Sequence, residues 1–134
     1  TPQLAVDGAF AEWARLVGID GIPARVPPGG PLAITLYWEA LGEPEADYTV
    51  FVQLLSVDDR VIAQHDGVPA LGRWPTRAWL PGQMIADRVE LAFADTSYKG
   101  QARLIVGFYE STSLVRVATG EGADHIELGG LVLE

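Results

Sequence analysis

The sequence predicts an all-β domain: a two-sheet antiparallel β-sandwich, immunoglobulin-like or jelly-roll, with about eight strands. Apolar residues alternate with polar ones in five separate segments, which is the period of a strand with one buried face. Turn residues separate these segments at intervals of roughly 8–15 residues, a spacing typical of sandwiches and barrels. No segment has the apolar period of a long helix, and connections this short favour antiparallel pairing.

The individual strands follow from local patterns. Residues 32–39 alternate strictly, and residues 48–57 are apolar on both faces, which is typical of a central strand covered by a second sheet. The polar turn at 58–60 joins this strand to a returning one, as in a β-hairpin. Residues 10–14 fit either a helical turn or an extended lead-in. The predicted strands are 15–20, 32–39, 48–57, 61–66, 84–93, 103–110 and 114–117, with one or two more within 125–133.

The predicted core consists of residues on the apolar faces of the strongest strands. Large apolar side chains that share one face of a strand bury that face against the opposite sheet. We therefore expect the following residues to be buried: Leu36, Trp38, Val50, Val52, Leu54, Leu104, Val106 and Phe108.

Residues 67–83 are rich in glycine and proline and predict a long, ordered loop that crosses the fold. Two tryptophans in this loop allow two interpretations. Exposed Trp rings with arginines beside them bind sugars, so the candidate carbohydrate-binding residues are Trp74, Trp79, Arg73 and Arg77. Alternatively, the tryptophans close one end of the sandwich. We expect the second arrangement, with Trp79 more buried than Trp74.

Composition excludes several classes of function. The 134 residues suit one domain spanning 1–134, and a start without Met indicates a piece excised from a longer protein. A net charge of −9 and scattered basic residues argue against nucleic acid. The chain has no cysteine and hence no thiolate metal site. Asparagine is absent and Met84 is the sole methionine, a pattern that either a thermophilic source or a GC-rich genome explains.

No catalytic or cofactor motif is present, so the chain is predicted to be non-enzymatic, without cofactor or metal. The pairs His65-Asp66 and Asp124-His125 would need further ligands from distant strands to hold zinc. No serine lies in a G-x-S-x-G turn. The acidic residues at 43–47 indicate a solvated turn rather than the two catalytic carboxylates of a glycosidase. Calcium is the better metal hypothesis, with loops 43–47, 58–59 and 121–124 as candidates, although none has the spacing of a calcium loop.

Several segments together resemble a known family. The sequence is similar to the soluble C-terminal β-sandwich domain of bacterial multi-spanning membrane proteins related to C-type, polyprenyl-phosphate-sugar-dependent glycosyltransferases. The resemblance covers the chain from about residue 15 and rests on structural turns and core strands. Its segments are Gly18-Ile19-Asp20, Pro28-Gly29, LAITLYW (32–38), DYTVFVQLL (47–55), Ala63-Gln64-His65-Asp66, Trp74-Pro75-Thr76, Trp79-Leu80-Pro81-Gly82, Asp87 and IVGFY (105–109).

The resemblance implies a non-catalytic accessory domain on the extracytoplasmic face of a bacterial membrane. Its partners would be the transmembrane part of the parent protein and a glycan or lipid-linked sugar. The transfer chemistry of that family is expected in the membrane part, so no catalytic residue is carried over. Two alternatives stay open: a carbohydrate-binding module that uses the Trp74/Trp79 loop, and a structural or protein-interaction sandwich whose long strands pair with a neighbour.

Overall fold

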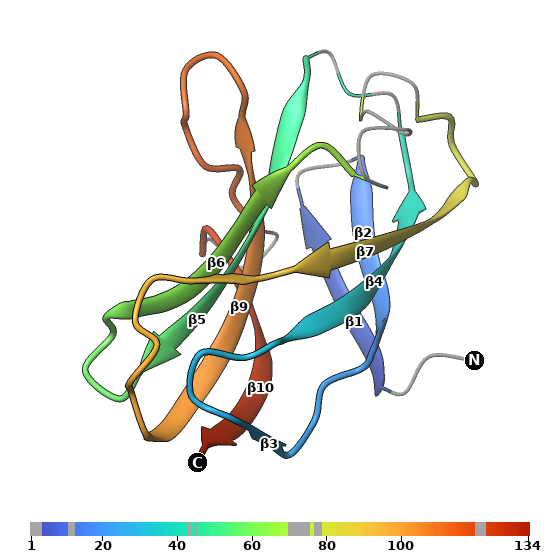
Figure 1. Cartoon of the computed structure of the whole chain (residues 1–134). Coiled ribbons are helices and arrows are strands. Elements are labelled where there is room, and N and C mark those ends of the chain that lie inside the picture. Colours follow the sequence, from blue (N-terminus) through green and yellow to red (C-terminus); the bar gives the residue numbers. More distant parts are fainter. Residues whose placement is uncertain are drawn as a thin grey trace.

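The computed structural model describes residues 4–10, 13–42, 44, 46–69, 76, 79–119 and 123–134, which form two packed β-sheets (Figure 1). This is the β-sandwich that the alternating sequence pattern predicts. No helix in these ranges has the length and hydropathy of a membrane span. The strands are β1 (Leu4–Phe10), β2 (Ala14–Asp20), β3 (Arg25–Val26), β4 (Ala33–Ala40), β5 (Tyr48–Ser56), β6 (Val61–Gly67), β7 (Met84–Glu90), β8 (Ala92–Phe93), β9 (Gly100–Glu110) and β10 (Ile126–Leu133).

One sheet has the strand order β1-β2-β4-β7, and the other has the order β3-β10-β9-β5-β6-β8. Neighbouring strands are antiparallel, as expected from the short connections, with one exception: the two-residue strand β3 runs parallel to β10. The register of β5 against β9 extends without interruption from Tyr48 opposite Glu110 to Ser56 opposite Ala102. These two long strands form the centre of the six-stranded sheet and carry most of its inner face.

Strand β1 is not among the predicted strands; it ends at Phe10 and pairs with β2, which begins at Ala14, and so it extends the smaller sheet. Two strand predictions need correction. The predicted strand 84–93 is two strands in different sheets: β7 pairs with β4, β8 pairs with β6, and the buried Leu91 lies at the crossing. Residues 114–117 do not form a strand, since only Arg116 makes a bridge, opposite Tyr109. Alternation continues through Leu91, so periodicity does not reveal the change of sheet there.

The core lies between the two sheets, and all eight residues predicted to be buried have no exposed surface. An aromatic cluster fills one end of this core. The ring of Phe108 lies edge-on or tilted against those of Phe10, Trp13, Trp38 and Trp79, with centroid separations of 5.4, 4.8, 4.7 and 6.1 Å. Aromatic pairs favour such edge and offset contacts. Through Trp79, the cluster joins both sheets to the crossing loop.

A second, smaller apolar cluster lies on the outer face of the six-stranded sheet. Phe51, Leu55 and Ile105 form it, because alternate residues of β5 and β9 point away from the core. The ring of Phe51 lies over Gly107, where any side chain would collide with it. The guanidinium of Arg116 covers the same ring at 4.3 Å from its centroid. The β9–β10 connection therefore covers part of this outer face. Among the residues that the structure describes, the part beside the turn after β5 stays open.

Candidate functional site

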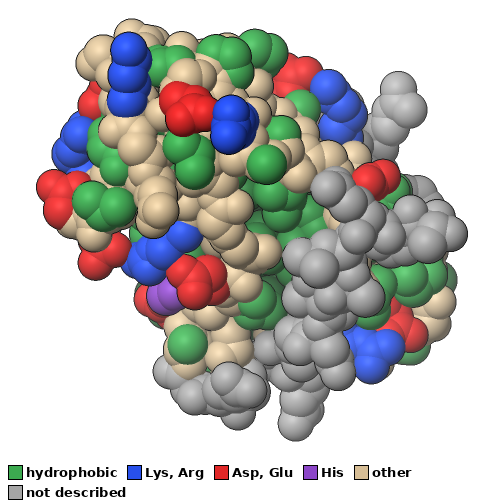
Figure 2. Space-filling view, turned by 90° about the horizontal axis from the view of Figure 1, so that it is seen from below, with side chains coloured by type: hydrophobic (Ala, Val, Ile, Leu, Met, Phe, Trp, Pro, Cys, Tyr) green, Lys and Arg blue, Asp and Glu red, His purple; other side chains and the backbone are tan. Residues whose placement is uncertain are grey.

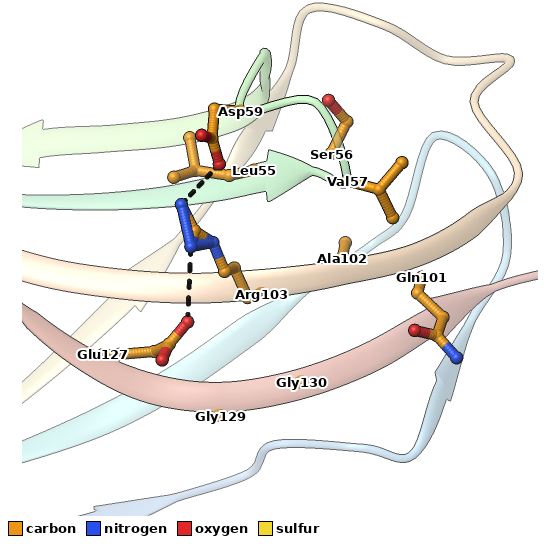
Figure 3. A pocket seen from close by; sticks show the side chains of 10 residues that line it. All are labelled: Leu55, Ser56, Val57, Asp59, Gln101, Ala102, Arg103, Glu127, Gly129 and Gly130. Atoms are coloured by element: carbon orange, nitrogen blue, oxygen red, sulfur yellow. Dashed lines mark hydrogen bonds and ion pairs between the residues drawn. The ribbon is translucent and has the colours of Figure 1, made fainter.

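A groove of about 440 Å³ occupies the open part of this outer face (Figure 3). It lies where the end of β5 and the turn after it meet the start of β9 and the middle of β10. Gln101 and Arg103 face the groove because their neighbours on β9, Ala102 and Leu104, point into the core. The lining residues are Leu55, Ser56, Val57, Asp59, Gln101, Ala102, Arg103, Glu127, Gly129 and Gly130.

Arg103 is the central charged residue of the groove. Its Nη2 donates to Asp59 Oδ1 at 2.5 Å, and its Nη1 donates to Glu127 Oε1 at 3.4 Å. Figure 3 shows the guanidinium lying between the two carboxylates, which come from opposite sides of the groove. The side chains of Asp59 and Glu127 are 70% and 57% exposed. The trio is therefore open to solvent and accessible to a ligand.

The turn between β5 and β6 places Asp59 at the rim. Asp59 has a φ of 65°, in the left-handed region that Asp tolerates better than most residues. Its N–H donates to the Ser56 carbonyl at 3.0 Å, and the Arg60 N–H donates to Ser56 Oγ at 3.0 Å. A hydrogen bond from the Ser56 hydroxyl lowers the pKa of Asp58. Serine and aspartate thus build a closed turn from their own side chains.

A polar network behind the groove ties this turn to the start of β9. Arg60 Nη1 donates to Asp95 Oδ2 at 2.7 Å, and Asp95 also accepts from the Ser97 and Tyr98 N–H groups. The hydrogen bond from Arg60, followed by those from Ser97, lowers the pKa of Asp95 to about 2. Tyr98 donates its hydroxyl proton to the Gln101 carbonyl at 2.8 Å. The turn that carries Asp59 and the start of β9 at Gln101 are therefore held by one connected set of bonds.

Two glycines on β10 create the hollow. Gly129 has a φ of +134° at an irregularity in the pairing with β9, a conformation that other residues rarely adopt. A Cβ atom on Gly129 would meet nothing within 4 Å, and one on Gly130 would meet only the Ala102 carbonyl oxygen, at 3.4 Å. The space beside these positions is therefore empty because two consecutive residues lack side chains.

The crossing loop, which the sequence singled out, contributes one described tryptophan. Trp79 has no exposed surface and packs against Trp13, Trp38 and Phe108. A buried ring offers no face to a sugar, so Trp79 has the role of core residue that we expected rather than that of a stacking platform. Arg73, Trp74 and Arg77 lie outside the described residues, and their part in carbohydrate binding stays a prediction.

The histidine and carboxylate pairs do not converge. His65 lies on β6, whereas His125 precedes β10, where its Nδ1 is 2.8 Å from Asp124 Oδ1. This bond, with help from Arg116, lowers the pKa of Asp124. Among the residues that the structure describes, no three His, Asp or Glu side chains are arranged to hold a metal ion. The calcium candidates at residues 43, 45, 121 and 122 lie outside those ranges.

Sequence reasoning did not identify the groove, because its residues come from three distant segments. Asp59 was placed in a polar turn, Arg103 at the start of a strand, and Gly129-Gly130 inside another strand. Two local signals were present. An arginine interrupts the outward face of the apolar strand β9, and a glycine pair interrupts β10, which in a strand often marks a bulge or a close approach to a ligand.

Comparisons with known proteins identify the fold. No family model matches the sequence, and no curated protein matches it. Among solved structures, the C-terminal domain of Wzt is similar, with a TM-score of 0.64 and 9% sequence identity. The match covers 100% of this chain and 82% of that domain. At this identity the likeness establishes the β-sandwich fold alone, and it does not show the glycosyltransferase relation that the sequence resemblance implies.

Proposed function

We propose that this chain is a non-catalytic accessory domain that binds a glycan for a longer protein. The observation that carries the proposal is the groove on the outer face of the six-stranded sheet, with Arg103 held between Asp59 and Glu127. Its volume of about 440 Å³ lies in the range of small-molecule sites. The groove is more polar than most small-molecule sites, and its polar groups Asp59, Arg103 and Glu127 converge at its centre.

The chemistry of the lining suits a sugar. A sugar hydroxyl both donates and accepts hydrogen bonds, so a site for it needs both kinds of group. Arg103 supplies donors, Asp59 and Glu127 supply acceptors, and the amide of Gln101 supplies both. Val57, which is 75% exposed, adds apolar surface for the C–H groups of a sugar ring. The groove is also shallow and open to solvent, which allows a longer chain to continue past it.

The same geometry argues against hydrolysis of that glycan. A glycosidase places two carboxyl groups on either side of the scissile bond, with roughly 5–9.5 Å between them for the bond or for a water molecule. Here the space between Asp59 and Glu127 is occupied by the Arg103 guanidinium, which bonds to both. The two carboxylates therefore serve to orient Arg103 and to accept hydrogen bonds.

We further propose that the parent protein is a membrane-embedded, glycosyltransferase-like protein and that the domain lies on the extracytoplasmic side. Two observations support this context. The sequence resembles domains attached to such proteins, and the similar solved structure is itself the C-terminal domain of a longer protein. In this role the domain would hold a glycan or a lipid-linked sugar near the membrane part, which carries out the chemistry.

The test is binding of the purified chain to an immobilised glycan array, with two matched variants. Arg103→Ala removes the central donor of the groove. Arg88→Ala removes an exposed arginine that pairs with Glu90 at 2.7 Å beside a second hollow, of about 310 Å³, at the β4–β7 side of the other sheet. We expect Arg103→Ala to weaken binding at least about tenfold and Arg88→Ala to leave it unchanged. Binding that depends on Arg88 instead, or no binding to any glycan, would contradict the proposal.

A further inference from the structure

We infer that the groove selects uncharged glycan segments and rejects acidic ones, an inference that rests on the proposed function and narrows its ligand class. The first step is the charge of the groove. Its charged residues are Arg103, Asp59 and Glu127, so one positive and two negative charges leave an excess of one negative charge. The chain as a whole has a net charge of −9, and acidic and basic side chains are interspersed on the face shown in Figure 2. An anion that enters the groove therefore meets a repulsive field.

The second step is that Arg103 is already neutralised. A free arginine would make the groove an anion site, because its planar fork pairs with carboxylates and phosphates. Here each of its two terminal nitrogens faces a carboxylate of the protein, at 2.5 and 3.4 Å. A uronate or phosphate on the ligand would have to displace Asp59 or Glu127, and would then lie beside the displaced carboxylate. That exchange replaces the ion pair between Arg103 and a protein carboxylate with one between Arg103 and the ligand. It also places the anionic group of the ligand beside the displaced carboxylate, and these two negative charges repel each other.

The third step is the hydrogen-bond pattern that remains. Asp59 and Glu127 use two of the five N–H donors of the guanidinium, and each carboxylate retains lone pairs. Donors and acceptors therefore alternate across the groove. Two neighbouring hydroxyls of a sugar match this alternation, since each can accept from Arg103 and donate to a carboxylate. A carboxylate on the ligand only accepts, so it offers no proton to the remaining lone pairs of the protein carboxylates.

The fourth step is the space that the ligand occupies. The glycines of β10 leave its backbone accessible, so a sugar ring can lie directly on the strand. Unlike Gly129, Gly130 does not have a positive φ, and a Cβ there makes one ordinary contact, at 3.4 Å. Gly130→Val would therefore fill the groove from its floor while the strand keeps its conformation. This substitution blocks the space in the groove without changing its charge, so it tests where the sugar binds independently of electrostatic repulsion.

The experiment compares neutral tetrasaccharides with the uronate tetrasaccharides that differ only by oxidation at C6, in the mannose, glucose and galactose series. Affinities are measured by titration calorimetry with the purified chain at low and physiological ionic strength. We expect the neutral member of the bound series to bind at least about tenfold more tightly, a preference that shrinks as salt screens the repulsion. Glu127→Gln removes one negative charge with little change of shape, so the preference should fall to within about threefold.

Two further variants complete the design. Gly130→Val should abolish binding of both members while circular dichroism and the melting temperature stay as in the parent chain; if it does not fold, Arg103→Gln takes its place. Glu90→Gln, on the other sheet, should leave the preference unchanged. Acidic members that bind as tightly as neutral ones, or a preference unaffected by Glu127→Gln, would overturn this inference alone. If no member of any series binds, the proposed function fails and the inference fails with it.

Discussion

Phe108 is the residue on which the aromatic core most depends, and Phe108→Ala tests that role. The side chain has no exposed surface and contacts four aromatic rings. Phe10 and Trp38 belong to the opposite, four-stranded sheet, whereas Trp13 and Trp79 lie in connecting segments at this end of the sandwich. Removing the ring deletes buried apolar surface and leaves a cavity. Both effects lower the free energy of unfolding.

The expected loss is at the upper end of the range for such changes. Buried Phe→Ala substitutions cost about 3–5 kcal/mol, and the cost depends on how far the surroundings collapse into the space. Around Phe108 the lining consists of large rings, Trp13, Trp38 and Trp79 among them, which cannot bend into the cavity. Each edge-on aromatic pair adds about 0.5–1.5 kcal/mol beyond area burial. We therefore expect Phe108→Ala to lower the free energy of unfolding by about 4–5 kcal/mol.

Urea denaturation followed by tryptophan fluorescence and by circular dichroism measures this loss, since three tryptophans lie in the same cluster. Leu114→Ala is the matched control on the turn after β9, where the side chain is 67% exposed, and it should change the stability by less than about 0.5 kcal/mol. If Phe108→Ala does not fold, Phe108→Leu should still fold with a loss of about 1.5 kcal/mol. A loss below about 1 kcal/mol for Phe108→Ala would refute the assignment of the ring to the centre of the core.

Four other predictions follow from the described contacts. In a variant with Trp79 as its sole tryptophan, acrylamide should quench the fluorescence poorly, because the ring is buried; free quenching in the folded state would contradict this. The pKa of Asp95 is about 2 in the folded chain, against 3.8 ordinarily. The ionised Asp95 therefore stabilises the folded chain fully above about pH 4, and this contribution is lost as the pH falls towards 2. Asp95→Asn should remove this dependence when the free energy of unfolding is measured from pH 4 to pH 2. Arg116→Ala uncovers Phe51 and should cost about 1 kcal/mol in urea melts, whereas Arg25→Ala, in an exposed pair with Glu134, should cost less than about 0.5 kcal/mol. The purified chain should not turn over glycosides, esters or phosphates; turnover that a single side-chain substitution abolishes would overturn the non-catalytic assignment.

Much of the fold could be predicted because strand patterning is local. The alternation in β4 and the two apolar faces of β5 report which side of each strand is buried, and the structure confirms those faces. The strand predictions failed where the local sequence pattern carries no information about which strands pair. The chain changes sheets at Leu91 without breaking the alternation. The pattern of residues 10–14 fits a helical turn as well as an extended lead-in, so it does not predict β1.

Of the candidate functional residues, too, only some could be predicted from the sequence. Trp79 could be expected in the core, because a large ring in a loop that crosses a sandwich has apolar surface to bury. The groove could not be expected, since Asp59, Arg103 and Glu127 look in the sequence like ordinary surface charges. Only pairing of β9 with both β5 and β10 brings them together, and that pairing depends on contacts between residues far apart in the chain.

The sequence by itself therefore determined the fold class, the buried faces and the absence of a recognisable catalytic motif, because periodicity and residue type act over a few neighbouring positions. The tertiary structure decided the strand order, the change of sheet at Leu91 and the position of the groove. Those features depend on which strands lie side by side, and many orders are compatible with the same alternating pattern. The groove also depends on missing side chains at Gly129 and Gly130, whose effect appears only once β10 lies beside β9.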